Sequence, residues 1–154
     1  MADKSKLGMV FPVYTFTVTK DKIIEFAIAV SQKENREQIN PIYSDEEAAR
    51  KAGYQGIPIP PTFAICSFFW TGDGLMEVIK TLGLDLNKLL HREEEFEYFG
   101  NIYAGDVLTR KMKVTEMFEK GKKERLVSVT VLETEIINQR GELVLKDRTR
   151  LMER

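Results

Sequence analysis

Residues 57–80, with the sequence IPIPPTFAICSFFWTGDGLMEVIK, constrain the fold of this chain more than any other stretch. Pro60 and Pro61 stand directly before an apolar run that ends at Trp70. Because proline is tolerated in the first helical turn, where its missing N–H has no intrahelical partner, we predict a helix that begins near Pro61. Apolar residues lie nearly all round its first two turns, which is typical of a buried helix. Such a helix requires other elements to wrap it.

The same stretch is interrupted, which argues against a membrane span. Residues 71–74, Thr-Gly-Asp-Gly, break the apolar run well short of the roughly 20 residues that cross a bilayer. Helical periodicity resumes at Leu75 and continues to Leu82. We therefore expect a long central helix inside a globular domain, and no membrane partner.

The chain before this stretch contains a candidate strand and two candidate helices. Residues 9–18 alternate as a strand would, with Val10 and Phe16 on the same face, and Pro12 favours an edge position or a bulge. A helix is predicted from Lys20 to about Val30, because its apolar residues follow helical spacing.

A second, shorter helix is predicted between the first helix and the prolines. Ser44 followed by Glu47 matches the capping box, in which a serine caps the helix and a glutamate follows three residues later. The helix continues through Lys51, and Gly53 ends it as a C-cap.

The last third of the chain is typical of strands, which we place at residues 92–99, 107–118, 124–137 and 143–152. With the first strand they predict a five-stranded antiparallel sheet wrapped around the central helix, an α+β arrangement. A length of 154 residues is most simply one domain, residues 1–154. Because such a sheet leaves unpaired edges, we expect a dimer.

Composition and charge exclude several classes of function. The formal net charge is −1 and no basic block is present, so nucleic acid is a poor partner. Cys66 is the single cysteine and His91 the single histidine, which excludes an intramolecular disulfide and a metal site built from cysteine or histidine clusters. The first six residues are polar and form no apolar signal core, so we expect a cytoplasmic protein.

Two short motifs carry a resemblance to a known family. One is EQINPIYSD at residues 37–45, and the other is PPTF at residues 60–63. They resemble the MaoC-like family of (R)-specific enoyl hydratases and 3-hydroxyacyl dehydratases. HREEEFEY at 91–98 and YAGD at 103–106 extend the resemblance over nearly the whole chain. The family has the hot-dog fold, with a long helix wrapped by an antiparallel sheet. PPTF is similar to its N-terminal dehydratase-like subfamily, which includes non-catalytic subunits of heterodimeric 3-hydroxyacyl dehydratases.

The positions that the resemblance makes catalytic carry the wrong residues here. Active members have an Asp-x-Asn-Pro-hydrophobic-His motif whose aspartate and histidine hold the reacting water. The aspartate position is Gln38, which cannot titrate, and the histidine position is Tyr43, whose ordinary pKa is about 10. The backbone N–H that polarises the thioester carbonyl falls at Pro61, after Pro60, and proline has no N–H to offer. Asn40 matches the motif, so we expect the loop to keep its shape without its chemistry.

The resemblance therefore implies an accessory subunit of a heteromeric hydratase or dehydratase acting on CoA or acyl-carrier-protein thioesters. A catalytic hot-dog partner would supply the aspartate, the histidine and the oxyanion donor. No catalytic residue, metal or cofactor is expected in this chain. Residues 56–63 and the region of Trp70 are expected to face the acyl chain. The candidate substrate-binding residues are Asn40, Pro60, Pro61, Thr62, Phe63 and Trp70.

Two other functions stay open, along with structural interpretations of single residues. The chain could be a homodimeric acyl-CoA-binding or regulatory module without catalysis. It could also be a thioesterase, which needs an acid such as Glu37 or Glu34 near the start of the central helix. Tyr43 is interpreted first as an aromatic filler, and Cys66 as a small buried hydrophobe. His91 is interpreted as structural, since no acidic partner for it is identifiable from the sequence.

Overall fold

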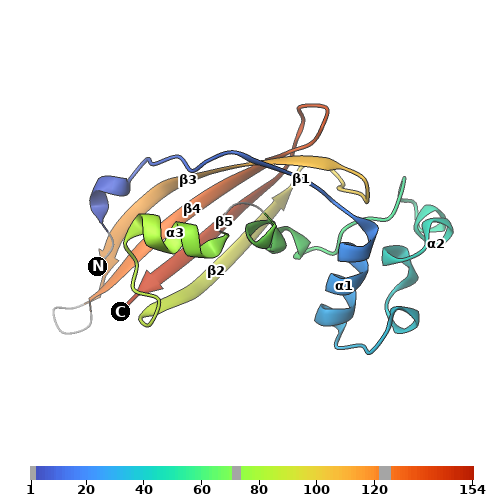
Figure 1. The fold of residues 1–154 in the computed structure, drawn as a ribbon, viewed down its shortest axis with the longest axis horizontal. Helices are drawn as coiled ribbons and strands as arrows, with labels where there is room; N and C mark the ends of the chain where they lie inside the picture. The colour runs from blue at the N-terminus through green and yellow to red at the C-terminus, as the bar shows by residue number, and fades with distance from the viewer. Residues whose placement is uncertain (1–2, 71–73, 122–125) are drawn as a thin grey trace.

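A curved antiparallel sheet carries helical segments against one of its faces (Figure 1). The computed structural model describes residues 3–70, 74–121 and 126–154. Its elements are η1 (Lys4–Lys6), β1 (Tyr14–Thr17), α1 (Lys20–Ser31), η2 (Arg36–Gln38), η3 (Pro41–Tyr43), α2 (Glu46–Lys51), η4 (Phe63–Phe69), α3 (Leu75–Leu82), β2 (Leu89–Tyr98), β3 (Val107–Lys120), β4 (Val127–Ile137) and β5 (Leu143–Glu153), where η denotes a 3-10 helix.

The sheet has five strands in the order β1-β3-β4-β5-β2, and every neighbouring pair is antiparallel. This confirms the predicted α+β class and the number of strands. The short β1 and the longer β2 form the two edges, as Pro12 predicted for the first strand. The fourth predicted segment of strand begins at residue 124, which lies outside the described residues, and β4 is described from Val127.

The central helical stretch differs from the single long helix that the sequence predicts. It comprises the seven-residue 3-10 segment η4 and the eight-residue helix α3. Of the interruption expected at residues 71–74, Gly74 caps α3 and the other three residues lie outside the described residues. Bonds between residues three apart, such as Phe63 N–H to the Pro60 carbonyl at 3.0 Å, tighten the first segment. Its predicted burial is confirmed for most of the segment, but Phe69 is exposed.

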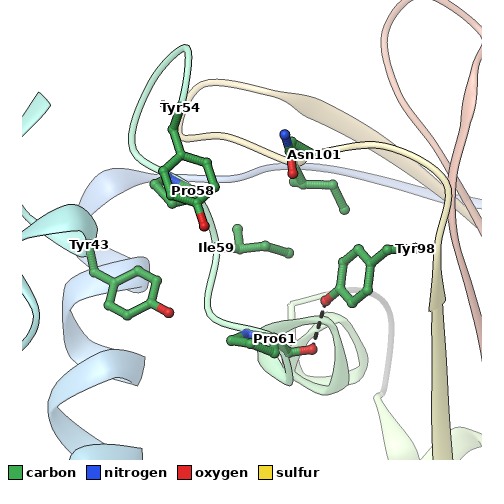
Figure 2. A pocket seen from close by; sticks show the side chains of 8 residues that line it. Tyr43, Tyr54, Pro58, Ile59, Pro61, Tyr98 and Asn101 are labelled. Atoms are coloured by element: carbon green, nitrogen blue, oxygen red, sulfur yellow. Dashed lines mark hydrogen bonds between the residues drawn. The ribbon is translucent and has the colours of Figure 1, made fainter. Parts of the chain in front are cut away.

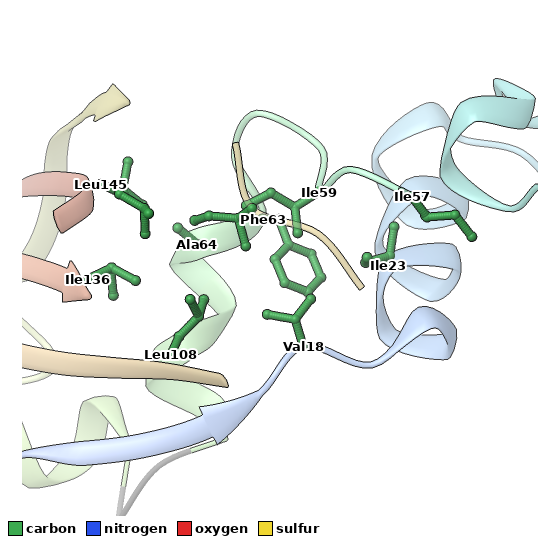
Figure 3. Close-up of a cluster of buried hydrophobic side chains, with 11 residues drawn as sticks. Val18, Ile23, Ile57, Ile59, Phe63, Ala64, Leu108, Ile136 and Leu145 are labelled. Carbon is green, nitrogen blue, oxygen red and sulfur yellow. The ribbon is translucent and has the colours of Figure 1, made fainter. Parts of the chain in front are cut away.

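The main hydrophobic core lies between this helical stretch, the sheet and α1 (Figure 3). Phe63, at the start of η4, packs among side chains from α1, β3, β4 and β5. A second cluster joins α3 to the other end of the sheet, where Val78, Ile79 and Leu82 are buried. The helical stretch therefore bridges two parts of the core along one face of the sheet.

Two local predictions need correction. The cap of α2 is Asp45, not Ser44, because the Asp45 carboxylate accepts the Ala48 N–H at 2.7 Å. Val10 does not share the buried face of the first strand. It forms only an isolated bridge to Lys113 and is exposed, because regular pairing begins at Tyr14. Within the described residues, no helix combines the length and apolar character needed to cross a membrane.

Candidate functional site

A cavity of about 190 Å³ opens where the loop before α2, the proline-rich segment and the end of β2 meet (Figure 2). Its lining residues are Tyr43, Tyr54, Pro58, Ile59, Pro61, Tyr98, Asn101 and Ile102. The hydroxyls of Tyr43 and Tyr54 point toward the space in front of Ile59. The cavity therefore brings together Tyr43 and Pro61, the residues at the two positions that the resemblance assigns to the histidine and to the backbone donor.

Local hydrogen bonds fix the first wall of this cavity. Asn40 caps the 3-10 turn η3, since its side-chain oxygen accepts the Ile42 N–H at 3.2 Å. This turn presents Tyr43 at its end. Asn40 thus shapes the loop, and it is not among the residues that line the cavity.

The second wall is an extended segment that pairs with the loop before β3. Ile59 N–H donates to the Ile102 carbonyl at 3.1 Å, and Ala104 N–H donates to the Ile57 carbonyl at 2.9 Å. These bonds hold residues 57–59 in an extended conformation, and the chain then turns at Pro61 and Thr62 into η4. Pro61 lies at the cavity, whereas Pro60 is buried and is not among the lining residues.

Two tyrosines of the cavity, Tyr43 and Tyr98, are hydrogen-bond donors rather than bases. Burial, together with the charge of Asp147, raises the pKa of Tyr98 to about 12. Burial also raises the pKa of Tyr43, and the neighbouring Tyr54 adds to that effect. Both hydroxyls therefore keep their protons at neutral pH. The Tyr98 hydroxyl donates a hydrogen bond to the Pro61 carbonyl at 2.8 Å. This carbonyl, just before the helical stretch, is therefore already hydrogen-bonded within the chain.

Most of the residues singled out from the sequence do not meet in this cavity. Gln38 is exposed, and its side-chain oxygen accepts the Glu34 N–H at 3.0 Å. Neither Glu34 nor Glu37, the acids that a thioesterase would require, is among the lining residues. Of the six candidate substrate-binding residues, only Pro61 lines this cavity.

The aromatic candidates belong instead to the core beside η4. The Phe63 ring is buried, with its centroid 5.0 Å from that of Trp70. Trp70 is partly exposed, and the Lys22 ammonium lies 5.3 Å from its ring centroid. Thr62 precedes η4 without a side-chain capping bond. Burial also raises the pKa of Cys66, against an opposing effect of Lys22, in keeping with a protonated thiol.

Sequence analysis missed four residues that complete the cavity. Tyr54 follows α2, Tyr98 ends β2, and Asn101 and Ile102 lie in the next loop. Two of them gave a signal, since Tyr98 alternates with Phe96 along the predicted strand and Tyr54 follows Gly53 as a Gly-aromatic pair. Asn101 and Ile102 reach the cavity through the pairing of two distant loops, which no local pattern reveals.

A second feature is an apolar groove of about 330 Å³ between the helical stretch and the β2 side of the sheet. Nine of its eleven lining residues are apolar: Ile65, Phe68, Phe69, Leu75, Ile79, Leu86, Leu89, Leu132 and Leu151. The two others are His91 and Thr149. Its size falls within the range of roughly 300–1,000 Å³ that is common for small-molecule sites.

His91 has an acidic partner after all. A bulge at Arg92 shifts the register of β2, so that His91 and Glu94 reach the same face of the sheet. His91 Nε2 lies 2.7 Å from the nearer Glu94 carboxylate oxygen. The other carboxylate oxygen accepts the Thr149 hydroxyl at 3.0 Å. Because the sequence gives no sign of this bulge, the pair could not be predicted.

Solved structures with the same fold include the HadBC (3R-hydroxyacyl-ACP dehydratase) complex from Mycobacterium tuberculosis. Its matching chain is 24% identical, with a TM-score of 0.75 and 96% of each chain covered. The (R)-hydratase PhaJ1 from Pseudomonas aeruginosa is 18% identical, with a TM-score of 0.62, covering 96% of this chain and 81% of its own. A chain of the ChsH1-ChsH2 complex from M. tuberculosis is 15% identical, with a TM-score of 0.63 and coverage of 96% and 98%. At these identities the likeness shows a common hot-dog fold.

Relatives with higher identity belong to the proteins named UPF0336. The relative from Thermobifida fusca is 34% identical over 139 residues, covering 90% of this chain and 84% of its own. The relative from Streptomyces avermitilis is 33% identical over 153 residues, covering 99% and 95%. The family model described as FAS1-like, dehydratase domain region, matches residues 5–147. The chain therefore belongs to the FAS1-like dehydratase-region family.

Proposed function

We propose that this chain is the non-catalytic subunit of a heteromeric (R)-specific enoyl-thioester hydratase or 3-hydroxyacyl-thioester dehydratase. A catalytic hot-dog subunit supplies the aspartate, the histidine and the oxyanion donor. This chain completes the assembly and forms part of the substrate-binding surface. The substrate is an acyl thioester of CoA or of an acyl-carrier protein.

The composition of the tyrosine-lined cavity carries the proposal. None of the described residues that line it is an aspartate, glutamate, histidine or lysine. Adding water to an enoyl thioester needs a group that takes and returns a proton near neutral pH. Tyr43 and Tyr98, with raised pKa values, cannot fill that role, and Pro61 has no N–H for the carbonyl. The fold fits a dehydratase, but this cavity lacks the acid–base group and the N–H donor that the reaction needs.

Two further observations support a heteromeric assembly and an acyl ligand. The HadBC and ChsH1-ChsH2 structures, whose fold this chain shares, are named as complexes. The apolar groove beside η4 has the size and lining of a site for a hydrocarbon chain. Phe69 stands at that groove and is 71% exposed, so its ring is accessible to a ligand or to a partner chain.

The purified chain is expected to hydrate crotonyl-CoA no faster than buffer. Co-expressed with a hot-dog protein from the same genome that carries Asp-x-Asn-Pro-x-His, it is expected to copurify with an activity at least roughly 100-fold higher, since acid–base groups contribute about 10²–10⁴-fold. Loss of the enoyl absorbance measures the rate. Alanine at the partner's motif histidine should remove the activity, and Glu47→Gln on the exposed surface of α2 here should not. Rapid turnover by the lone chain would contradict the proposal.

Restoring the two side chains of the motif is not expected to create activity. In the lone Gln38→Asp/Tyr43→His variant, residue 38 still lies outside the cavity and Pro61 still lacks the N–H donor. Crotonyl-CoA hydration should therefore stay at the background rate, with circular dichroism confirming the fold. Measurable hydration would mean that only the two side chains were missing.

A further inference from the structure

The two edges of the sheet differ in length and in what surrounds them. β1 is a four-residue edge strand, whereas β2 presents ten residues whose outer backbone groups face no neighbouring strand. Exposed apolar side chains flank the β2 edge at both ends, with Leu90 41% and Phe99 52% exposed. A long edge with apolar flanks is the part of a sheet that most readily takes another strand.

The outer face of the sheet is the face opposite the helical stretch. On this face each of the strands β2 to β5 carries a column of charged side chains, and the sign of the charge alternates from one strand to its neighbour. β3 contributes Lys111 and Lys113, which stand opposite Glu135 and Glu133 of β4. Those glutamates in turn stand opposite basic residues of β5. Ion pairs join the columns, for example Lys113 to Glu133 at 3.3 Å. Each strand from β3 to β5 thus faces a neighbour of opposite charge.

The alternation ends at the free edge with an acidic column. Glu93, Glu95 and Glu97 of β2 stand opposite Arg150, Arg148 and Lys146 of β5. Glu93 is ion-paired with Arg150. A strand added at the free edge of β2 would continue this alternation if its outer face carried basic side chains.

A second copy of this chain that pairs through the central part of β2 opposes like charges. Antiparallel self-pairing about a two-fold axis keeps outer-face residues on the outer face. With the axis at Glu94, Glu95 or Phe96, at least two glutamates of one copy stand opposite glutamates of the other. Like charges directly opposite each other destabilise an antiparallel pair.

We infer that β2 is the docking edge for a different hot-dog chain whose pairing strand is basic on its outer face, and that its glutamates select against self-pairing. The inference rests on the proposed function, and it specifies the chemistry of the partner. The column of glutamates repels the acidic edge of a second copy and attracts a strand with basic side chains.

The test uses this chain and charge variants of its own edge as probes. In one arm, sedimentation equilibrium compares wild type with Glu93→Gln/Glu95→Gln/Glu97→Gln at about 20 mM and 500 mM NaCl. The Gln variant should self-associate roughly tenfold or more tightly than wild type at low salt. The matched control, Glu34→Gln/Glu46→Gln/Glu47→Gln, changes the net charge equally away from the edge and should behave as wild type.

In the second arm, wild type is mixed with a copy carrying Glu93→Lys/Glu95→Lys/Glu97→Lys, which supplies a basic edge. Native mass spectrometry should detect mixed dimers, and exchange of β2 backbone amides should slow in them while that of β1 amides does not. If the triple variant fails to fold, Glu95→Lys replaces it, because Glu95 lies at the centre of the column.

Two outcomes overturn the inference. One is a wild-type dimer at low salt whose affinity the Gln substitutions leave unchanged. The other is a folded Lys variant that forms no mixed dimer with wild type. Neither result contradicts the proposal of an accessory subunit, provided that the copurified complex is active. Activity of the lone chain would contradict that proposal, independently of how the β2 edge pairs.

Discussion

Replacing Phe63 with alanine is expected to lower the free energy of unfolding by about 3–5 kcal/mol, the usual cost of removing a buried aromatic ring. The Phe63 side chain is 1% exposed. Its ring meets Phe26 edge-on at a centroid distance of 5.5 Å and lies 5.0 Å from the Trp70 ring. The core there joins α1, the helical stretch and the sheet, so a cavity cannot close by moving one element.

Phe69 provides the matched control, since it lies in the same segment and is 71% exposed. Phe69→Ala should change the free energy of unfolding by less than about 0.5 kcal/mol. Urea denaturation followed by the fluorescence of Trp70, the single tryptophan, measures both variants. Equal losses for the two substitutions would show that Phe63 is not the packed residue of this segment.

The sequence allowed the sheet to be predicted well because its strands follow local patterns. Residues 143–152, for example, were predicted as a strand, and β5 spans Leu143–Glu153. The helical stretch was harder to predict. Its apolar residues signalled burial, but a residue spacing that suits an α-helix does not exclude the tighter 3-10 geometry of η4.

Only those residues of the candidate site that belong to a short sequence motif could be predicted. Tyr43 and Pro61 were located by their motifs, and both line the cavity. Gln38 was placed by the same motif but turns away to bond the loop backbone. Tyr98 and Asn101 reach the cavity because β2 and the following loop fold back on the prolines, a contact between distant parts of the chain. Pairings of this kind leave no periodic signal in one sequence.

Replacing Arg110 with methionine is the second substitution with a large expected effect, a loss of about 1–3 kcal/mol near pH 8, the usual cost of leaving a buried polar group without its partner. Arg110 is buried on β3, with its guanidinium carbon 4.6 Å from the Phe68 ring centroid. Asp147 on β5 is fully buried nearby, and the charge of Arg110 favours its ionised form. Removing Arg110 leaves that carboxyl near Glu94 without its compensating charge.

The loss should depend on pH in a defined direction. Burial, followed by the charge of Glu94, raises the pKa of Asp147 well above its ordinary value. The folded state therefore binds this proton more tightly than the unfolded chain, whose aspartates titrate at about 3.9, and the free energy of unfolding falls as pH rises above that value. Without Arg110 the pKa rises further, so Arg110→Met should cost more at about pH 8 than at about pH 5.

A double-mutant cycle with Asp147→Asn separates this electrostatic effect from lost packing. Adding Asp147→Asn to Arg110→Met removes the uncompensated carboxyl, so most of the difference between the two pH values should disappear. Lys111→Met, at the exposed neighbouring position on β3, is the control and should change stability by less than about 0.5 kcal/mol. Urea denaturation of the four proteins of the cycle and the control measures each step. A loss in Arg110→Met that is the same at both pH values would mean that the packing of Arg110 against Phe68, rather than its charge, stabilises the fold.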